Sequence, residues 1–337
     1  DRAASPGDEK GKRMKRYCYH GGTVLDGPAF CSHEGNNLLN SPDLSRFESC
    51  QHDNDSLATW CRLDFEGDWR RRLIVILRAY FDLGATFDRV SNLGKPAAMG
   101  IIGLAGYLAE ANAWIDFGRR WRRVLRDNGV KVFHMTDFER GIPPYDWGKR
   151  KRESFIVRLL RIIGETAMFG TMSAIVRRDL DALSKQDRNK FGNIYRYCAI
   201  TCMARICQWL DEQDIKESVD YVFELGDDGQ GPFRVMINEV IHRRDFRERY
   251  RVNSVNFMTK LQAPGLQTGD IAAYETCKHV PRVMGEETRP IRKSLETLLA
   301  RVPHRGGFLT LTEIRQYITD TESLPSLTRV FQKGPRR

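Results

Sequence analysis

Three carboxylates lie beside apolar stretches that are far apart in the sequence. Asp82 closes a long apolar run, Glu224 closes a shorter one, and Asp270 opens what we expect to be a short helix. Carboxylate oxygens are the hard ligands that Mg²⁺ and Mn²⁺ prefer. A pair of such ions can activate water and stabilise charge during phosphodiester hydrolysis. If folding gathers the three side chains, they would form a divalent-metal site.

Each of these carboxylates also has an ordinary structural explanation. An Asp after a strand is often a turn residue, a Glu can simply end a strand in solvent, and Asp270 could be a helix N-cap. The set gains weight because each member lies against apolar sequence and near a glycine. Asp227 and Asp228 occupy a glycine-rich turn and are secondary ligand candidates, although a solvated turn explains them better.

Two further residues are candidates for a role beside these acids. His134 follows a short apolar stretch, where it could contact a phosphate or act as a general acid or base. A hydrogen-bonded structural histidine explains it equally well. Glu275 lies five residues after Asp270 on the expected helix. It therefore points to a different face, and we expect it to be structural.

The motifs that are missing exclude several classes of enzyme, and the net charge indicates the kind of partner. The sequence has no strand–GxxxxGK[ST]–helix loop, which argues against an ATPase, and it has no G-x-S-x-G, H-E-x-x-H or protein-kinase signature. The 337 residues carry a net charge of +10, which favours an anionic partner such as nucleic acid, although a basic protein without such a partner explains the charge equally well. The runs Arg119–Arg123 and Lys149–Arg152 could bind phosphates, or they could be solvated helix faces.

Alternating strands and helices must position these residues. We expect strands at 73–82, 99–108, 130–133, 169–176, 219–224 and 252–257. We expect helices at 114–125, 149–165, 194–212, 233–241, 270–278, 291–300 and 311–318. This pattern predicts an α/β sheet with helices on its faces. The modest loop between the first two strands predicts an antiparallel start.

The ends of the chain differ from its middle. Residues 1–70 have little periodicity, and we expect them to be an extension that is loop or disordered. Within them Cys18, Cys31 and Cys50 are each followed two residues later by His. In an extended segment each Cys–His pair could chelate a metal, but no spacing matches the usual zinc frameworks. We expect residues 71–285 to form the core, and 286–337 to form helices and a basic tail.

The remaining composition indicates a cytoplasmic protein without a membrane span. Hydrophobic residues make up 41% of the chain, yet no apolar run approaches the roughly 20 residues of a transmembrane helix. No apolar signal core is present near the start, so secretion is not expected. The first residue is Asp rather than Met, as in a fragment or a reading frame begun too far upstream. We expect four cysteines to be reduced core thiols: Cys198, Cys202, Cys207 and Cys277.

Five short motifs, in order and spacing, resemble the bacterial family known as domain of unknown function 3800. The motifs are Arg78–Asp82, Leu104–Tyr107 with Trp114–Leu125, Phe133–Phe138, Tyr221–Asp227 with Gly229 and Gly231, and Leu266–Glu275. The resemblance spans about residues 75–285. It implies a ribonuclease-H-like mixed sheet with catalytic acids on the first strand, a later strand and a late helix.

By this resemblance Asp82, Glu224 and Asp270 fall on the acidic positions, and His134 falls on the histidine of the family. One departure is important. The family usually has Asp-Glu-Ser-Gly where this chain has Asp82-Leu83-Gly84-Ala85. The change removes one possible ligand and alters the turn that presents Asp82. A milder departure is Thr268-Gly269 before Asp270, where the family has other small residues.

Three functions remain open on the sequence. The first is a Mg²⁺- or Mn²⁺-dependent nuclease or phosphodiester hydrolase. The second is a nucleic-acid-binding protein without catalysis, suggested by the acid missing at Leu83. The third is a protein-interaction module whose acids are structural. The first predicts that the carboxyl groups of Asp82, Glu224 and Asp270 converge within reach of one ion, or of two ions about 3.5–4 Å apart.

Overall fold

The computed structural model describes residues 19–20, 23–24, 76–86 and 100–323. The chain separates into two compact units, residues 1–53 and 54–337. In the first unit, β1 (Tyr19–His20) pairs antiparallel with β2 (Thr23–Val24). The metal hypothesis for the Cys–His pairs falls on side chains outside the described residues, as does the predicted basic tail.

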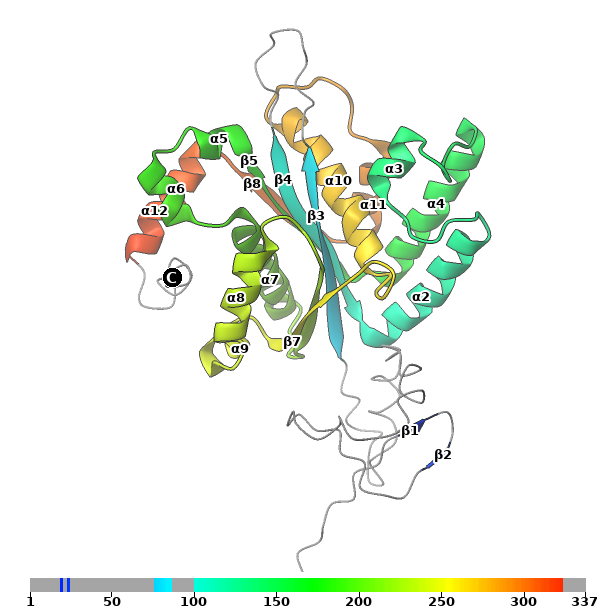
Figure 1. Ribbon diagram of the computed structural model, residues 1–337, viewed down its shortest axis with the longest axis horizontal. Coiled ribbons are helices and arrows are strands. Elements are labelled where there is room, and N and C mark those ends of the chain that lie inside the picture. The colour runs from blue at the N-terminus through cyan, green and yellow to red at the C-terminus, as the bar shows by residue number, and fades with distance from the viewer. Residues whose placement is uncertain (1–18, 21–22, 25–75, 87–99, 324–337) are drawn as a thin grey trace, which may run out of the picture. The chain divides into compact units, whose positions relative to one another are not determined.

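A six-stranded mixed sheet organises the second unit, in the order β7-β6-β3-β4-β5-β8 (Figure 1). The strand β4 pairs antiparallel with both β3 and β5. The other three pairs, β3 with β6, β6 with β7 and β5 with β8, are parallel. The strands are β3 (Leu77–Thr86), β4 (Ile101–Glu110), β5 (Phe169–Val176), β6 (Val219–Glu224), β7 (Val252–Met258) and β8 (His304–Leu309).

Helices cover both faces of this sheet (Figure 1). On one face lie α2 (Ala111–Arg126), α3 (Met135–Arg140), α4 (Lys149–Thr166), α10 (Leu266–Val283) and α11 (Lys293–Arg301). On the other lie α5 (Arg177–Asp181), α6 (Lys185–Phe191), α7 (Ile194–Glu212), α8 (Gln230–Val240), α9 (Arg244–Arg249) and α12 (Leu311–Ser323). Each face of the sheet therefore has its own hydrophobic core.

The central strand β3 is buried on both faces, which is why its sequence is apolar almost throughout. Its side chains alternate between the two cores: Phe81 packs beneath α7 and α8, whereas Tyr80 packs on the side of α10. Because side chains alternate along a strand, Asp82 points to the same side as Tyr80. The acid is thus directed toward α10.

Most of the expected elements are confirmed. The strands at 169–176 and 219–224 and the helix at 194–212 have the predicted bounds, and the antiparallel start is confirmed by the pairing of β3 with β4. The α/β class with a mixed sheet is confirmed as well. In the described part of the chain, no helix combines the length and apolar composition needed to cross a membrane.

Three expectations about the elements are wrong. Asp270 does not open a short helix, because α10 begins four residues earlier at Leu266 and runs for 18 residues, so Asp270 is not its N-cap. Residues 130–133 form no strand, because side chains rather than a neighbouring strand bind their backbone: Gln267 accepts from the Phe133 amide and Tyr145 donates to the Val132 carbonyl. The C-terminal part is not only helical, because β8 adds a sixth strand beside β5. Its sequence did not indicate a strand, because two of its residues are glycines. A glycine is needed at position 306, since a Cβ there would lie 2.0 Å from the Met172 side chain.

Candidate carboxylate site

Asp82 lies inside β3 and not at its end, which corrects the expectation from the sequence. The strand continues to Thr86 because residues 83–86 pair with 101–104 of β4. Asp82 is consequently only 1% exposed, and its Oδ1 accepts a hydrogen bond of 2.8 Å from the Leu83 amide. Burial and the charges of neighbouring carboxylates raise the pKa of Asp82 well above its usual value. The alternative that Asp82 is a turn residue after the strand is therefore wrong.

The helix α10 approaches β3 closely enough to bring Asp270 beside Asp82. A Cβ added to Gly269 would lie 2.8 Å from the backbone nitrogen of Asp82 and 3.0 Å from its Cβ. A glycine at this position therefore lets helix and strand touch backbone to backbone. The Thr268-Gly269 departure noted in the sequence keeps the close packing that the site needs.

The three predicted carboxylates meet around one ammonium group. The Nζ atom of Lys260 lies 2.7 Å from Asp82 Oδ2, 3.0 Å from Glu224 Oε2 and 3.4 Å from Asp270 Oδ2. The lysine follows β7 in the turn that leads to α10, and its side chain is 10% exposed. Folding therefore gathers acids from β3, β6 and α10 at one point. Lys260 was not predicted, because a lysine before a helix is ordinarily a surface residue.

Asp227 belongs to this cluster, so the explanation of a solvated turn is wrong for this residue. Burial and the charge of Glu224 raise the pKa of Asp227 to about 7, against the opposing effect of Lys260. Its Oδ2 is buried and accepts no hydrogen bond from a described residue. The neighbouring Asp228 is exposed, as the sequence suggested. Only one of the two acids of this turn therefore adds charge to the site.

His134 lies at the rim of the cluster. Its Nδ1 is 3.7 Å from Asp270 Oδ2, beyond hydrogen-bonding distance, and its side chain is 46% exposed. The same Asp270 oxygen accepts a 3.0 Å hydrogen bond from the Met135 amide. Asp270 is thereby tied to the start of α3, and the imidazole can reach both this carboxylate and solvent.

A buried glutamine connects the elements around Lys260. Gln267 Oε1 accepts hydrogen bonds from Trp121 Nε1 and the Phe133 amide, both at 2.9 Å, and its Nε2 donates to the Lys260 carbonyl at 3.0 Å. Sequence reasoning gave Gln267 no role. The available signal was a polar amide in an otherwise small and apolar stretch, since such a group must be hydrogen-bonded when it is buried.

The carboxylate oxygens of the cluster are suitable ligands for a divalent ion, but their positions around the lysine are not those of a metal site. Asp82 Oδ2 and Glu224 Oε2 are buried and form ion pairs with Lys260 Nζ. Such hard oxygens fit Mg²⁺ or Mn²⁺. Among the described residues, however, no group of three or more His, Cys, Asp or Glu side chains is placed to hold a metal ion. The ammonium group lies where these carboxylates converge.

Glu275 is held by other residues. It is fully buried and its Oε2 accepts from Arg292 Nε at 2.8 Å, while its Oε1 accepts from Ser294 Oγ at 2.5 Å. These bonds tie α10 to the start of α11. The residue thus has the structural contacts expected from its position in the sequence.

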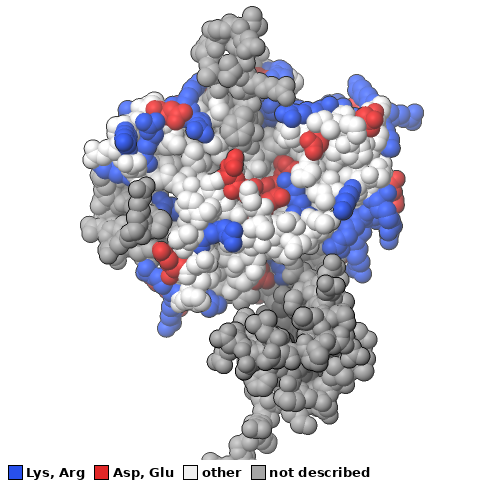
Figure 2. Space-filling model, in the orientation of Figure 1, with Lys and Arg blue, Asp and Glu red and all other residues white. Residues whose placement is uncertain are grey.

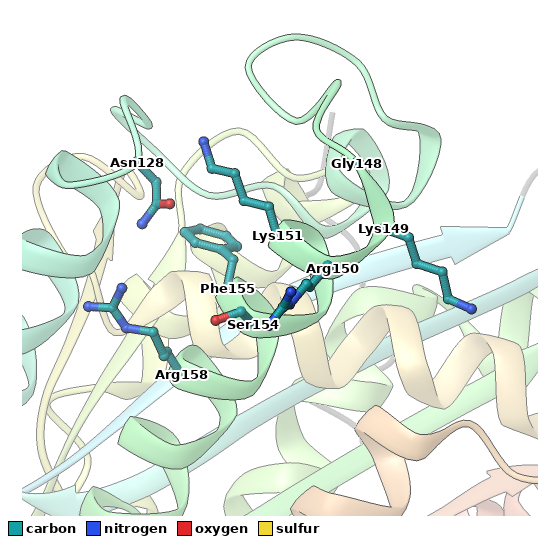
Figure 3. A pocket seen from close by; sticks show the side chains of 8 residues that line it. All are labelled: Asn128, Gly148, Lys149, Arg150, Lys151, Ser154, Phe155 and Arg158. Carbon is teal, nitrogen blue, oxygen red and sulfur yellow. The ribbon is translucent and has the colours of Figure 1, made fainter.

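A second polar feature is a basic pocket of about 580 Å³ between the end of α2 and the start of α4 (Figure 3). Its lining residues are Asn128, Gly148, Lys149, Arg150, Lys151, Ser154, Phe155 and Arg158. Lys151 and Arg158 lie on either side of the Phe155 ring, whereas Lys149 points away from them (Figure 3). Figure 2 shows acidic side chains gathered near the middle of the face drawn, with basic side chains around its rim.

No protein-family model matches the chain, and no curated protein matches it either. The resemblance to domain of unknown function 3800 therefore stays a prediction that depends on the five motifs. The four cysteines predicted to be core thiols are free and buried, so that expectation is confirmed.

Proposed function

We propose that the protein is a metal-dependent hydrolase of phosphodiester bonds in nucleic acid. The observation that carries this proposal is the convergence of Asp82, Glu224 and Asp270 on one point, within 3.4 Å of Lys260 Nζ. Three acids from three distant elements are seldom gathered without a chemical role, since burying carboxylates together is costly. Perturbed acids in one cluster are also typical of active sites.

The fold adds support to the proposal. A mixed sheet with acids on its first long strand, a later strand and a late helix is what the resemblance to the ribonuclease-H-like family implies. In this protein the acids lie on β3, β6 and α10. We accordingly propose membership of that family and a ribonuclease-H-like arrangement of the sheet.

Each residue of the site has a separate role in this proposal. Asp82, Glu224 and Asp270 would hold Mg²⁺ or Mn²⁺, with Asp227 beside them. When bound, the metal supplies an activated water and stabilises charge on the phosphate. His134 is half-exposed at the rim and can exchange a proton with a substrate oxygen there. Gln267 positions Lys260 and the loop before His134 through its three hydrogen bonds.

Nucleic acid is the proposed substrate because the protein is strongly basic around an acidic centre. The net charge is +10 although the site itself gathers four acids. Basic side chains surround the acidic centre in Figure 2, and the pocket at α4 adds four cationic side chains. Phosphate contacts of this kind supply most of the affinity in sequence-independent binding.

The test is cleavage of labelled single- and double-stranded DNA and RNA with Mg²⁺ or Mn²⁺. Asp82→Asn and Asp270→Asn should each reduce cleavage at least about 100-fold, as expected when a metal ligand is lost. Asp228→Asn removes an exposed acid of the neighbouring turn and should leave cleavage unchanged. Equal cleavage by the wild type and by the double variant Asp82→Asn/Asp270→Asn would refute the proposal.

A second candidate is a nucleic-acid-binding protein without catalysis. Two observations favour it: Leu83 stands where the family has an acid, and Lys260 lies among the carboxylates. This candidate predicts salt-sensitive binding that survives neutralisation of Asp82, Glu224 and Asp270 together, with no metal-dependent cleavage. Binding that is insensitive to salt would count against it.

We also propose a cytoplasmic location. The four cysteines of the described core are free thiols, and unpaired cysteines are usual in reducing compartments. Fractionation of cells that produce the protein would test this location.

A further inference from the structure

One lysine is the cation at the centre of the acidic cluster. Its ammonium carries one positive charge and lies within 3.4 Å of oxygens from three carboxylates. Asp227 is a fourth acid whose charge interacts with the group. A single ammonium can balance only one ionised carboxylate, and burial opposes the ionisation of Asp82 and Asp227. A doubly charged ion at the point where the three carboxylates converge could balance more than one of them in the ionised form.

The buried oxygens share one cation. Asp82 is 1% exposed, and its Oδ2 lies 2.7 Å from the ammonium. Glu224 Oε2 is also buried and lies 3.0 Å from the same ammonium. Buried carboxylate oxygens normally have hydrogen-bond or metal partners. Among the described residues, both of these oxygens depend on the single ammonium of Lys260.

The backbone and the side chain of Lys260 are held by different contacts. Gln267 Nε2 binds the Lys260 carbonyl, and the turn is closed by Thr259 and Gln262, whose side chains bond to each other at 3.0 Å. The ammonium is carried by a four-carbon chain with rotatable bonds. Rotation of that chain would vacate the point between the carboxylates without any movement of β7 or α10.

We propose that Lys260 is a resident counter-ion that occupies the metal position of this site and is displaced when a divalent ion binds. This proposal depends on the function proposed above, because it assumes that the carboxylates bind metal. In the metal-free protein the ammonium holds the acids together. In the presence of Mg²⁺ or Mn²⁺ it competes for the same oxygens, so Lys260 sets the concentration of metal at which the site fills.

The experiment compares Mn²⁺ binding by the full chain carrying Lys260→Met with that by the wild type. Methionine keeps most of the length of the side chain and removes the charge. Calorimetry and electron paramagnetic resonance of Mn²⁺ measure binding without any substrate. Lys260→Met should bind Mn²⁺ at least tenfold more tightly, because the competing cation is gone. The control is Lys216→Met, which removes a lysine that is 70% exposed, and it should bind like the wild type.

Thermal unfolding provides a second measurement. Without metal, Lys260→Met should unfold at a lower temperature than the wild type, since the acids then repel one another unpaired. Mn²⁺ should raise the unfolding temperature of the variant more than that of the wild type. If Lys260→Met does not fold, Lys260→Gln removes the same charge, keeps a hydrogen-bond donor and takes its place in both measurements.

The outcomes separate this proposal from the proposed function. Unchanged or weaker Mn²⁺ binding by both neutral variants overturns the role of Lys260, while metal-dependent cleavage by the wild type would leave the hydrolase intact. Tighter binding by the variants without cleavage by the wild type supports the counter-ion and refutes the hydrolase. If neither the wild type nor the variants bind Mn²⁺ at millimolar concentration, the counter-ion proposal is overturned.

Discussion

Four acids and one ammonium share the site, and their mutual charges decide how each acid ionises. The pKa of Asp82 is raised by burial and by Asp270, and Lys260 opposes the shift. The pKa of Asp227 is raised to about 7 by burial and by Glu224. Burial raises the pKa of a carboxyl because the charged form loses its hydration. At neutral pH the metal-free site therefore stores repulsion that either protons or a metal can relieve.

The raised pKa of Asp227 predicts a pH-dependent stability. In the unfolded chain this carboxyl ionises near its ordinary value of about 3.9. Between about pH 4 and pH 7 the folded protein keeps a proton that the unfolded chain has lost, so the free energy of unfolding falls as pH rises. Asp227→Asn removes this titration. We expect the variant to be more stable than the wild type at pH 8, by on the order of 2 kcal/mol, and to depend less on pH.

Urea unfolding at pH 5 and pH 8, with a chelator present, measures the difference. Asp228→Asn is the matched control, because it neutralises the exposed acid next in sequence and should shift the free energy of unfolding equally at both values. A variant Asp227→Asn that is less stable than the wild type at pH 8 would show that the negative charge stabilises the metal-free fold.

The three acids of the site could be predicted from the sequence, whereas the lysine between them could not. Asp82, Glu224 and Asp270 stand out because each interrupts or ends an apolar stretch. Lys260 does not, since its burial depends on a turn placed by Gln267 through a hydrogen bond across seven residues. The burial of Asp82 was also beyond the sequence, because it depends on the strand continuing past the acid into its pairing with β4.

At the scale of elements, the contact between α10 and β3 builds the site. Three glycines lie in this contact: a Cβ on Gly265 would meet the Tyr80 ring at 2.3 Å, one on Gly269 would meet Asp82, and one on Gly84 would meet the backbone of Ala273 at 2.9 Å. Helix and strand thus fit together because side chains are missing where they touch. Asp270 reaches the cluster as a result of this close approach.

A methyl group at Gly269 should therefore separate helix and strand. We expect Gly269→Ala to reduce the free energy of unfolding by about 1–3 kcal/mol, as overpacked core positions do. It should also weaken Mn²⁺ binding, because Asp270 moves away from Asp82. Gly118→Ala is the matched control, since Gly118 is a buried helical glycine with only Arg122 near its missing Cβ, at 3.5 Å. That control should be neutral or stabilising by up to about 1 kcal/mol.

Chemical denaturation of the wild type and the two alanine variants measures whether the free energy of unfolding falls for Gly269→Ala and stays the same or rises for Gly118→Ala. If Gly269→Ala were as stable as Gly118→Ala and bound Mn²⁺ normally, the close approach of α10 would not be what places Asp270. The comparison is informative because both substitutions add the same atom to a helix.

Elements with strong internal patterns could be predicted from the sequence, and elements defined by their neighbours could not. The helix α7 and the strands β5 and β6 carry their own apolar periodicity, and their bounds were predicted. Residues 130–133 look like a strand, but polar side chains from elsewhere bind their backbone. The strand β8 forms because it pairs with the edge of β5. Its own sequence does not indicate a strand, since it contains two glycines and an arginine among six residues.

At the scale of the whole molecule, an acidic centre lies within a basic body. The net charge is +10, and cationic side chains line the pocket at the start of α4. The first turn of α4 has no acidic residue, so the partial positive charge of the helix N-terminus adds to these side chains. Binding of a polyanion on this face would bring phosphates close to the protein without sequence preference.

This charge distribution predicts a particular dependence of DNA and RNA binding on salt. If Arg150 and Arg158 contact phosphates, neutralising both to Gln should weaken binding about equally for unrelated sequences and reduce the slope of log affinity against log salt by roughly 1–2. The control is Arg244→Gln on α9, a side chain that is 90% exposed over the opposite core. It should leave the slope unchanged. Fluorescence anisotropy from 50 to 300 mM salt measures this, and an unaltered slope in the double variant would place the bound nucleic acid elsewhere.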